Sequence, residues 1–224
     1  MAIWMFSKRR QQKLLLKMAS QNLTATLLLF TTFLFISRPI SAVHSPPLLN
    51  ATTNDLTFIR TSCNATIYPD LCFNSLASYA SAVQSSPARL TKLAIGVTIS
   101  KAKSTAVLLS KFSRSATKVK DCASYLKDAL DEMRDSLRTL RNISRGVGIG
   151  AAPSSVEMFR FKMSDVQTYM SAALTYEDTC TDEYEEMDEA GGTKTAVYDR
   201  VNNLKRLTSN ALALVNSYAN NGAP

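Results

Sequence analysis

The chain has 224 residues, with 26 Lys and Arg against 18 Asp and Glu and a formal net charge of +8. It contains a single histidine, His44, so nucleophilic pairs that depend on histidine are excluded from the rest of the chain. Six of the basic residues and none of the acidic ones lie before position 43, which leaves 20 basic against 18 acidic residues afterwards. A net charge of +2 over that remainder argues against nucleic-acid binding.

The first 42 residues have the pattern of a targeting segment. Five basic residues are followed by 14 mostly apolar residues, Leu23 to Ile36, and by the small pair Ser41-Ala42. Because a membrane span needs about 20 apolar residues, we predict a cleaved signal peptide over 1–42 and a secreted protein without membrane association after cleavage. An uncleaved signal anchor is the alternative, since the basic region is long. Residues 43–53 (VHSPPLLNATT) predict a flexible lead-in.

A short helical pair is predicted next, over 54–84. Its helices run approximately from Asn54 to Ser62 and from Pro69 to Ser81, folded around residues 64–68. The pair is too small to bury an apolar face alone, so we expect it to be cross-linked or docked against the rest of the chain.

Four long amphipathic helices are predicted over 85–224, because apolar residues recur at steps of three and four. The segments are separated by Ser85-Ser86-Pro87, by a weakly marked turn near 112–117, by the glycine-rich 145–155 and by Gly191-Gly192. Short connections favour antiparallel neighbours, so the expected fold is all-α: an up-down-up-down four-helix bundle preceded by a helical hairpin. The clearest core stripe comprises Val119, Cys122, Ala123, Leu126, Ala129, Leu130, Met133, Leu137 and Leu140.

Four cysteines downstream of a secretion signal indicate disulfide bonds. Cys63 and Cys72 flank one short turn, whereas Cys122 and Cys180 lie on core stripes of the second and third long helices. Since a disulfide requires α-carbons within about 7 Å, we pair Cys63 with Cys72 and Cys122 with Cys180. A zinc site is the alternative, but no histidine is available and the spacings match no zinc motif.

Charged residues are segregated along the chain. No acidic residue lies between Asp70 and Asp121, a stretch with eight basic ones, and this pattern is compatible with electrostatic docking. Eight carboxylates crowd the end of the third long helix: Glu177, Asp178, Asp182, Glu183, Glu185, Glu186, Asp188 and Glu189. They lie mainly off the core stripe, so we expect a solvated cluster without catalytic residues, metal site or cofactor.

Four segments match a known group of plant proteins in the same order. They are FIRTSCNATIYPDLCFNSL (58–76), DCASYLKDALDEMRDSL (121–137), DVQTYMSAALTYEDTC (165–180) and TSNALALVNSY (208–218). Together they resemble the plant invertase and pectin methylesterase inhibitor superfamily, including the inhibitor-like pro-regions of pectin methylesterases. No catalytic domain follows Pro224, so we expect a free-standing inhibitor domain over 54–224.

The resemblance implies two sequential disulfides, as already paired, and a non-catalytic protein of the apoplast or cell wall. It further implies inhibition by a one-to-one complex that covers the substrate cleft of pectin methylesterase. In the invertase branch a Pro-Lys-Phe segment begins the third helix, but residues 157–162 here read EMFRFK. We therefore expect pectin methylesterase as the partner. The alternatives are an acid invertase, a non-inhibitory protein that holds anionic pectin through Lys101 and Lys103, or a lipid carrier.

Individual contacts are harder to assign. We expect target contacts at exposed positions of the second and third bundle helices, first at Thr168, Ser171, Thr175, Tyr176 and Thr179. Three acceptor sequons for N-glycosylation follow the signal, at Asn50, Asn64 and Asn142.

Overall fold

A computed structural model describes residues 53–112, 117–146, 155–185 and 192–221, all within the compact unit Ser45–Pro224. The predicted signal peptide over 1–42, the lead-in apart from Thr53, and the Asn50 sequon lie outside the described residues. Every secondary-structure element in the described ranges is a helix.

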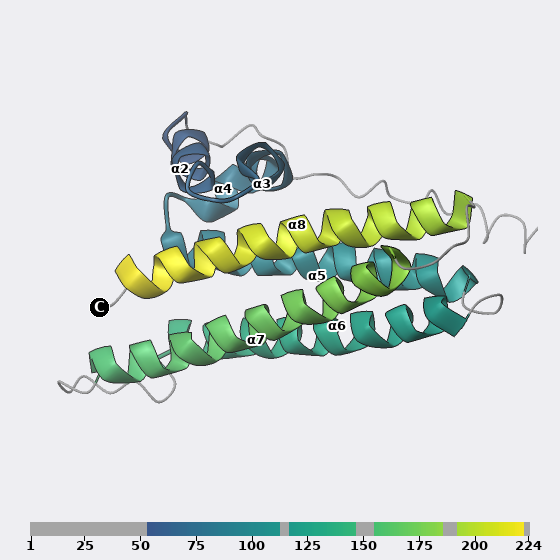
Figure 1. The fold of residues 1–224 in the computed structure, drawn as a ribbon. Helices are drawn as coiled ribbons and strands as arrows, with labels where there is room; N and C mark the ends of the chain where they lie inside the picture. The colour runs from purple at the N-terminus through teal and green to yellow at the C-terminus, as the bar shows by residue number, and fades with distance from the viewer. Residues whose placement is uncertain (1–52, 113–116, 147–154, 186–191, 222–224) are drawn as a thin grey trace, which may run out of the picture. The chain divides into compact units, whose positions relative to one another are not determined.

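Four long helices form a bundle (Figure 1): α5 (Pro87–Phe112), α6 (Thr117–Ser144), α7 (Ser155–Glu185) and α8 (Gly192–Asn221). Each helix packs on the one before it, α5 closes the ring against α8, and α6 with α7 forms the most extensive interface. The predicted up-down-up-down bundle is confirmed.

The buried residues follow the predicted stripes, because a helix packed on two neighbours hides one face of its 3.6-residue turn. Met133 of α6 and Met170 of α7 are among the largest fully buried side chains. Near the start of α7, Phe159 meets Tyr218 of α8 edge to face, with ring centroids 5.4 Å apart. Such an aromatic pair adds about 0.5–1.5 kcal/mol to the burial of its area.

The helix boundaries differ slightly from those expected. The third apolar run was expected to continue to Met187, which lies outside the described residues, and α7 is described as far as Glu185. Gly192 was predicted to end that helix, and instead it is the first residue of α8. Gly146 follows α6 with φ of 68°, in the left-handed region where a glycine carries no Cβ penalty, and its N–H donates to the carbonyl of Ile143 at 3.0 Å.

The hairpin consists of α2 (Thr53–Cys63), α3 (Pro69–Leu76), a 3-10 turn η2 (Ala77–Tyr79) and α4 (Ala80–Val83). Its second half was predicted as one helix from Pro69 to Ser81, and η2 interrupts that helix. The chain leaves the hairpin through Gln84 and Ser85, both with positive φ (48° and 51°). Ser85 Oγ donates to Oδ1 of the buried Asp55 at 3.0 Å, which ties this exit to the start of α2.

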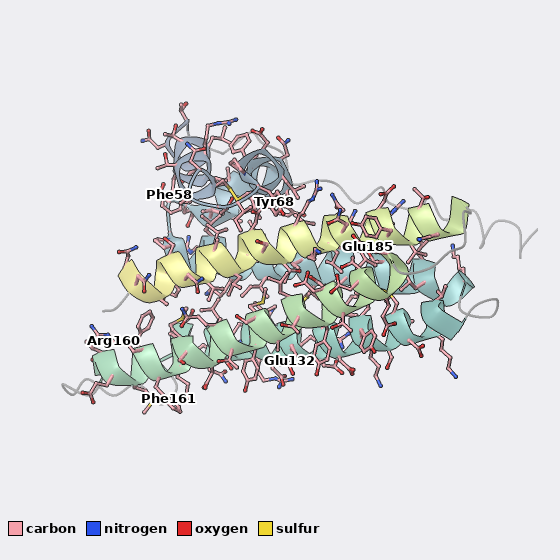
Figure 2. All side chains as sticks on the ribbon, in the orientation of Figure 1. Phe58, Tyr68, Glu132, Arg160, Phe161 and Glu185 are labelled. Carbon is pink, nitrogen blue, oxygen red and sulfur yellow. A yellow bond between two sulfur atoms is a disulfide. The ribbon has the colours of Figure 1, made fainter. Side chains whose placement is uncertain are left out.

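A polar clamp and apolar contacts dock the hairpin on α8 and α5. The side chain of Asn210, buried in α8, binds the backbone of Tyr68 twice. The Tyr68 N–H donates to Oδ1 at 3.1 Å, and Nδ2 donates to the Tyr68 carbonyl at 2.9 Å. Tyr68 lies where the hairpin meets α8 (Figure 2). The turn at 64–68 is therefore anchored to the bundle through its main chain.

Both predicted disulfides are present, and the described residues include no free cysteine. Cys63 and Cys72 join α2 to α3 with α-carbons 5.5 Å apart. Cys122 and Cys180 join α6 to α7 with α-carbons 4.7 Å apart. All four cysteines are buried, so the second bridge fixes α6 against α7 from within the core.

One described segment, Pro87–Lys111 of α5, is long and apolar enough for a membrane span by length and composition, with a mean hydropathy of 1.2. The sequence pattern predicted no membrane association after the signal peptide. Leu90, Ile95 and Leu109 of this helix are buried, and α5 packs on α6 and α8. The apolar residues of α5 thus belong to the core of the bundle.

Candidate target-binding surface

One stripe of α7 carries four of the five residues predicted to contact a target. Thr168, Ser171, Thr175 and Thr179 follow one another at steps of three and four, so they share a face. The first three are exposed and Thr179 is partly buried. The hydroxyls of Thr168, Thr175 and Thr179 each donate to the carbonyl four residues earlier, at 2.9, 3.1 and 2.9 Å. These short, tethered side chains would lose little rotamer entropy under a partner.

Tyr176 differs from the other four predicted residues. It is partly buried and packs against the hydrophobic core, beside the stripe and not on it. Its three-residue spacing from Ala173 explains this placement, since Ala173 is fully buried. Tyr176 is therefore less accessible to a partner than predicted.

Phe161 extends the same stripe toward the start of α7, at a step of seven residues from Thr168. Its side chain is 61% exposed, although Phe159 two positions earlier is buried. Figure 2 shows Phe161 near the first turns of α7, pointing away from the bundle. Phe161 was not among the predicted contact residues. It could have been found from the sequence, because it is an aromatic residue that does not lie on the apolar stripe of its helix.

A second linear feature lies on α6. Arg134, Arg138 and Arg141 share one face of α6, and Arg145 lies in the turn that follows it. All four are exposed and line a surface pocket that also contains Asn142. We call these four residues the arginine stripe. Arg134 pairs with Asp131, and Arg138 pairs with Asp135. Arg141 and Arg145 have no ion pair within the described ranges. The stripe therefore presents unneutralised positive charge on α6.

The opposite end of the bundle is tied by hydrogen bonds to acidic residues. The Tyr125 hydroxyl donates to Glu183 Oε1 at 3.0 Å, and the Tyr198 hydroxyl donates to Glu185 Oε1 at 2.7 Å. The hydrogen bond to Glu183 and the charge of that residue raise the pKa of Tyr125. These carboxylates act as acceptors that join α7 to α6 and α8.

Glu177 contradicts the expected solvated acidic cluster. Its side chain is fully buried between α7 and α8, and no hydrogen-bond partner of its Oε2 lies within the described residues. Burial raises the pKa of Glu177 well above its ordinary value of 4.5, and a hydrogen bond from Thr208 lowers it by less. Burial therefore favours the neutral form of this carboxyl over the charged form.

Thr208 of α8 is the hydrogen-bond partner of the buried Glu177. Thr208 Oγ1 lies 3.0 Å from Glu177 Oε1 and 3.2 Å from the Leu204 carbonyl. A hydroxyl has one proton, so it cannot donate fully to both acceptors at once. The Thr208 proton is therefore shared between Glu177 Oε1 and the Leu204 carbonyl, and this contact joins α7 to α8.

Metal binding has no candidate in the part of the chain that the structure describes. No group of three or more His, Cys, Asp or Glu side chains there is arranged to hold an ion.

Comparison with known proteins identifies the group to which this bundle belongs. The family model for plant invertase/pectin methylesterase inhibitors matches residues 57–214. The chain belongs to this family. The match spans both disulfides, the α7 stripe, the arginine stripe and Glu177. As a member of an inhibitor family the chain is not an enzyme, as predicted.

Two relatives and one solved structure illustrate the similarity. Pectinesterase inhibitor 11 of Arabidopsis thaliana is 38% identical over 200 residues, which cover 85% of this chain and 96% of that protein. Pectinesterase inhibitor 10 of the same plant is 38% identical over 176 residues, 74% of this chain and 52% of that protein. A crystal structure of a mutant form of a pectin methylesterase inhibitor from Arabidopsis has a TM-score of 0.47 and 19% identity, over 70% of this chain and 95% of that one.

Proposed function

We propose that this member of the family is a secreted inhibitor of a pectin methylesterase. It acts by forming a one-to-one complex in which α6 and α7 cover the substrate cleft of the enzyme. Support comes from the relatives named pectinesterase inhibitors, one of which is covered over 96% of its length at 38% identity. The predicted signal peptide and the two disulfides fit an extracellular, cell-wall location.

The α7 stripe is the observation that carries the choice of surface. Its centre, from Thr168 to Thr175, is exposed and has no charged side chain on the same face. Interface cores are depleted of charge and surrounded by a charged rim. Here the rim is supplied by Lys162 and Asp165 at one end and by Asp178 at the other, all partly buried or exposed.

Phe161 provides the anchor that such a surface needs. Most of the binding energy of an interface comes from a few residues, often aromatic ones that enter a pocket. At 61% exposure Phe161 has apolar area available for burial, and its backbone is held in the helix. We expect this ring to enter the enzyme.

The α6–α7 pair is ordered before any complex forms. The Cys122–Cys180 bridge and the largest helix interface of the bundle fix the two helices against each other. Ordering that is complete before association is not subtracted from affinity.

An inhibition panel tests the proposal. The mature chain is mixed at micromolar concentration and mildly acidic pH with several plant pectin methylesterases and acid invertases, and residual activity is measured. Inhibition of at least one esterase is expected. Loss of neither class of activity contradicts the proposal.

A matched pair of variants tests the surface. Thr175→Arg places a long charged side chain at the centre of the stripe, and we expect inhibition of the esterase to weaken on the order of a hundredfold. Ser104→Arg makes the same charge change at an exposed position of α5 and is expected to leave inhibition unchanged. Equal effects of the two variants would place the interface elsewhere.

An acid invertase is the second candidate target, because the family description includes invertase inhibitors. Residues 157–162 (EMFRFK) lack the Pro-Lys-Phe segment expected of that branch, so we rank it below the esterase. The same panel separates the two, since an invertase inhibitor would leave every esterase active.

A further inference from the structure

The arginine stripe contains none of the α7 residues on which the choice of inhibitor surface rests. Arg145 follows the last residue of α6 and lies eleven positions after Arg134, a distance of about 16 Å at the rise of an α-helix. Two of its guanidinium groups, on Arg141 and Arg145, have no ion pair within the described ranges, and both side chains are exposed. The segment from 136 to 156 contains no acidic residue, so the sequence supplies no nearby carboxylate to neutralise them.

Basic side chains from α5 add to this charge. Lys92 Nζ donates to Ser144 Oγ of α6 at 3.0 Å, which places its ammonium group beside the C-terminal half of the stripe. Partial burial, followed by the charges of Arg89 and Arg141, lowers the pKa of Lys92. Cations from two helices thus crowd one another here, and an anion would relieve their repulsion.

We propose that the arginine stripe, together with Lys92, is a binding site for a linear acidic polysaccharide, namely demethylesterified pectin. Guanidinium groups bind carboxylates with two parallel hydrogen bonds, and a row of them matches a chain with regularly repeated carboxylates. The row is open along a helix surface, which suits a polymer better than a small anion. The choice of polymer rests on the proposed function, because demethylesterified pectin is the product that a pectin methylesterase releases.

The site differs from the one expected from sequence, which placed pectin on Lys101 and Lys103 of α5. Those two lysines lie in the middle of α5, away from the end where Lys92 meets Ser144. They therefore serve as a matched control for charge.

The glycosylation sequon at Asn142 bears on the same site. Asn142 is exposed and lines the pocket between the arginines. A glycan on this residue would stand over the stripe and compete with the polymer. The experiment is therefore made on the mature chain with N-glycans removed.

The test compares binding of the mature chain to polygalacturonate and to fully methyl-esterified pectin, which has the same backbone without charge. We expect binding to polygalacturonate alone, weakened by added salt. Arg141→Gln with Arg145→Gln should weaken it about tenfold, since two exposed contacts are lost. Lys101→Gln with Lys103→Gln removes the same charge and should change it less than twofold.

Several outcomes would overturn the site. They are absence of binding, equal binding to the uncharged polymer, and equal loss in the two double variants. If the arginine variant keeps polymer binding but loses inhibition of the esterase, the stripe contacts the enzyme and not the polysaccharide. The binding measurement contains no enzyme, so its failure leaves the proposed function standing. Conversely, if the chain binds the polymer but inhibits no enzyme in the panel, the arginine site stands and the proposed function fails.

Discussion

The two ends of the four-helix bundle are stabilised by different kinds of interaction. Where α7 ends, a disulfide joins Cys122 to Cys180, a buried Glu177 meets Thr208, and Asp178 pairs with Lys205 at 2.9 Å. Where α7 begins, Phe159 is buried against Tyr218, and Gln167 Nε2 donates to Asn216 Oδ1 at the surface at 2.9 Å. One end therefore depends on covalent and titratable groups, and the other mainly on apolar packing.

This difference predicts different responses to the environment. Burial of apolar area is insensitive to pH, whereas a buried carboxyl links folding to proton uptake. A disulfide constrains the unfolded chain and is removed by reduction. The following experiments separate the two ends by stability and by its dependence on pH.

The largest effect is expected at the apolar end. Phe159→Ala removes a fully buried ring and should lower the free energy of unfolding by about 3–5 kcal/mol, equally at acidic and neutral pH. Phe161→Ala changes the same residue type two positions away, where the ring is 61% exposed, and should cost under about 0.5 kcal/mol. Denaturant unfolding at two pH values measures both, and similar losses for the two variants would refute the assignment.

Opening the long-range disulfide comes next. Cys122→Ala with Cys180→Ala should cost about 2–4 kcal/mol, lower the melting temperature by several degrees and weaken inhibition of the esterase. Opening Cys63–Cys72 should cost about 1.5 kcal/mol less, because its sequence separation is 9 instead of 58 residues. It should also affect inhibition less. If only the hairpin variant lost inhibition, the hairpin would be the contact surface.

Glu177→Gln should change the pH dependence of stability. The pKa of Glu177 is raised in the folded state, so between about pH 4.5 and that raised pKa the folded protein holds a proton that the unfolded chain has lost. Wild-type stability from this group is complete below pH 4.5 and falls as pH rises, by up to about 1.4 kcal/mol per pH unit. Glutamine keeps the shape and the hydrogen bond to Thr208, and should abolish this fall.

The control for that experiment is Glu157→Gln, an exposed carboxyl on the same helix. It removes the same charge and should leave the slope unchanged. The free energy of unfolding is measured from pH 4 to pH 8 for the wild type and both variants. Parallel slopes for wild type and Glu177→Gln would mean that Glu177 is already ionised in the fold.

The smallest effect concerns the ion pair of Asp178 with Lys205. Partial burial opposes the charge of Lys205, but the hydrogen bond and charge of Asp178 outweigh it and raise the pKa of the lysine. The side chains are 27% and 47% exposed, so Lys205→Gln should cost only about 0.5 kcal/mol. The difference from wild type should disappear in high salt, and a loss of several kcal/mol would show that the pair is more desolvated than described.

Periodicity was enough to predict the four long helices, their core stripes and the Cys122–Cys180 bridge, because each depends on which residues share a helix face. The Cys63–Cys72 bridge was predicted from the short turn between its cysteines. Glu177 was missed although its spacing was informative. It lies four residues after Ala173 and three before Cys180, on the buried stripe of α7. It was nevertheless assigned to the solvated cluster, because it stands at the start of a run of acidic residues.

Other features depend on distant parts of the chain. The clamp between Asn210 and Tyr68 joins residues 142 apart, and no local pattern pairs a buried amide with one particular turn. The spacing of the arginine stripe can be read from the sequence. The position of Lys92 beside it cannot, because that lysine is on α5 and reaches the end of α6 only through the packing of the two helices. The 3-10 turn at Ala77–Tyr79 has no glycine or proline to mark it.

The Asn210 clamp also sets an order of events during synthesis. The Cys63–Cys72 loop is short, and in the secretion proposed above it can close as soon as both cysteines meet an oxidising environment. Its hairpin must then wait, because the amide that binds its turn is in the last helix to be made. A hairpin closed at this stage would be covalently cross-linked but undocked until nearly the whole chain had been made. The first segment to be cross-linked is among the last to reach its native place.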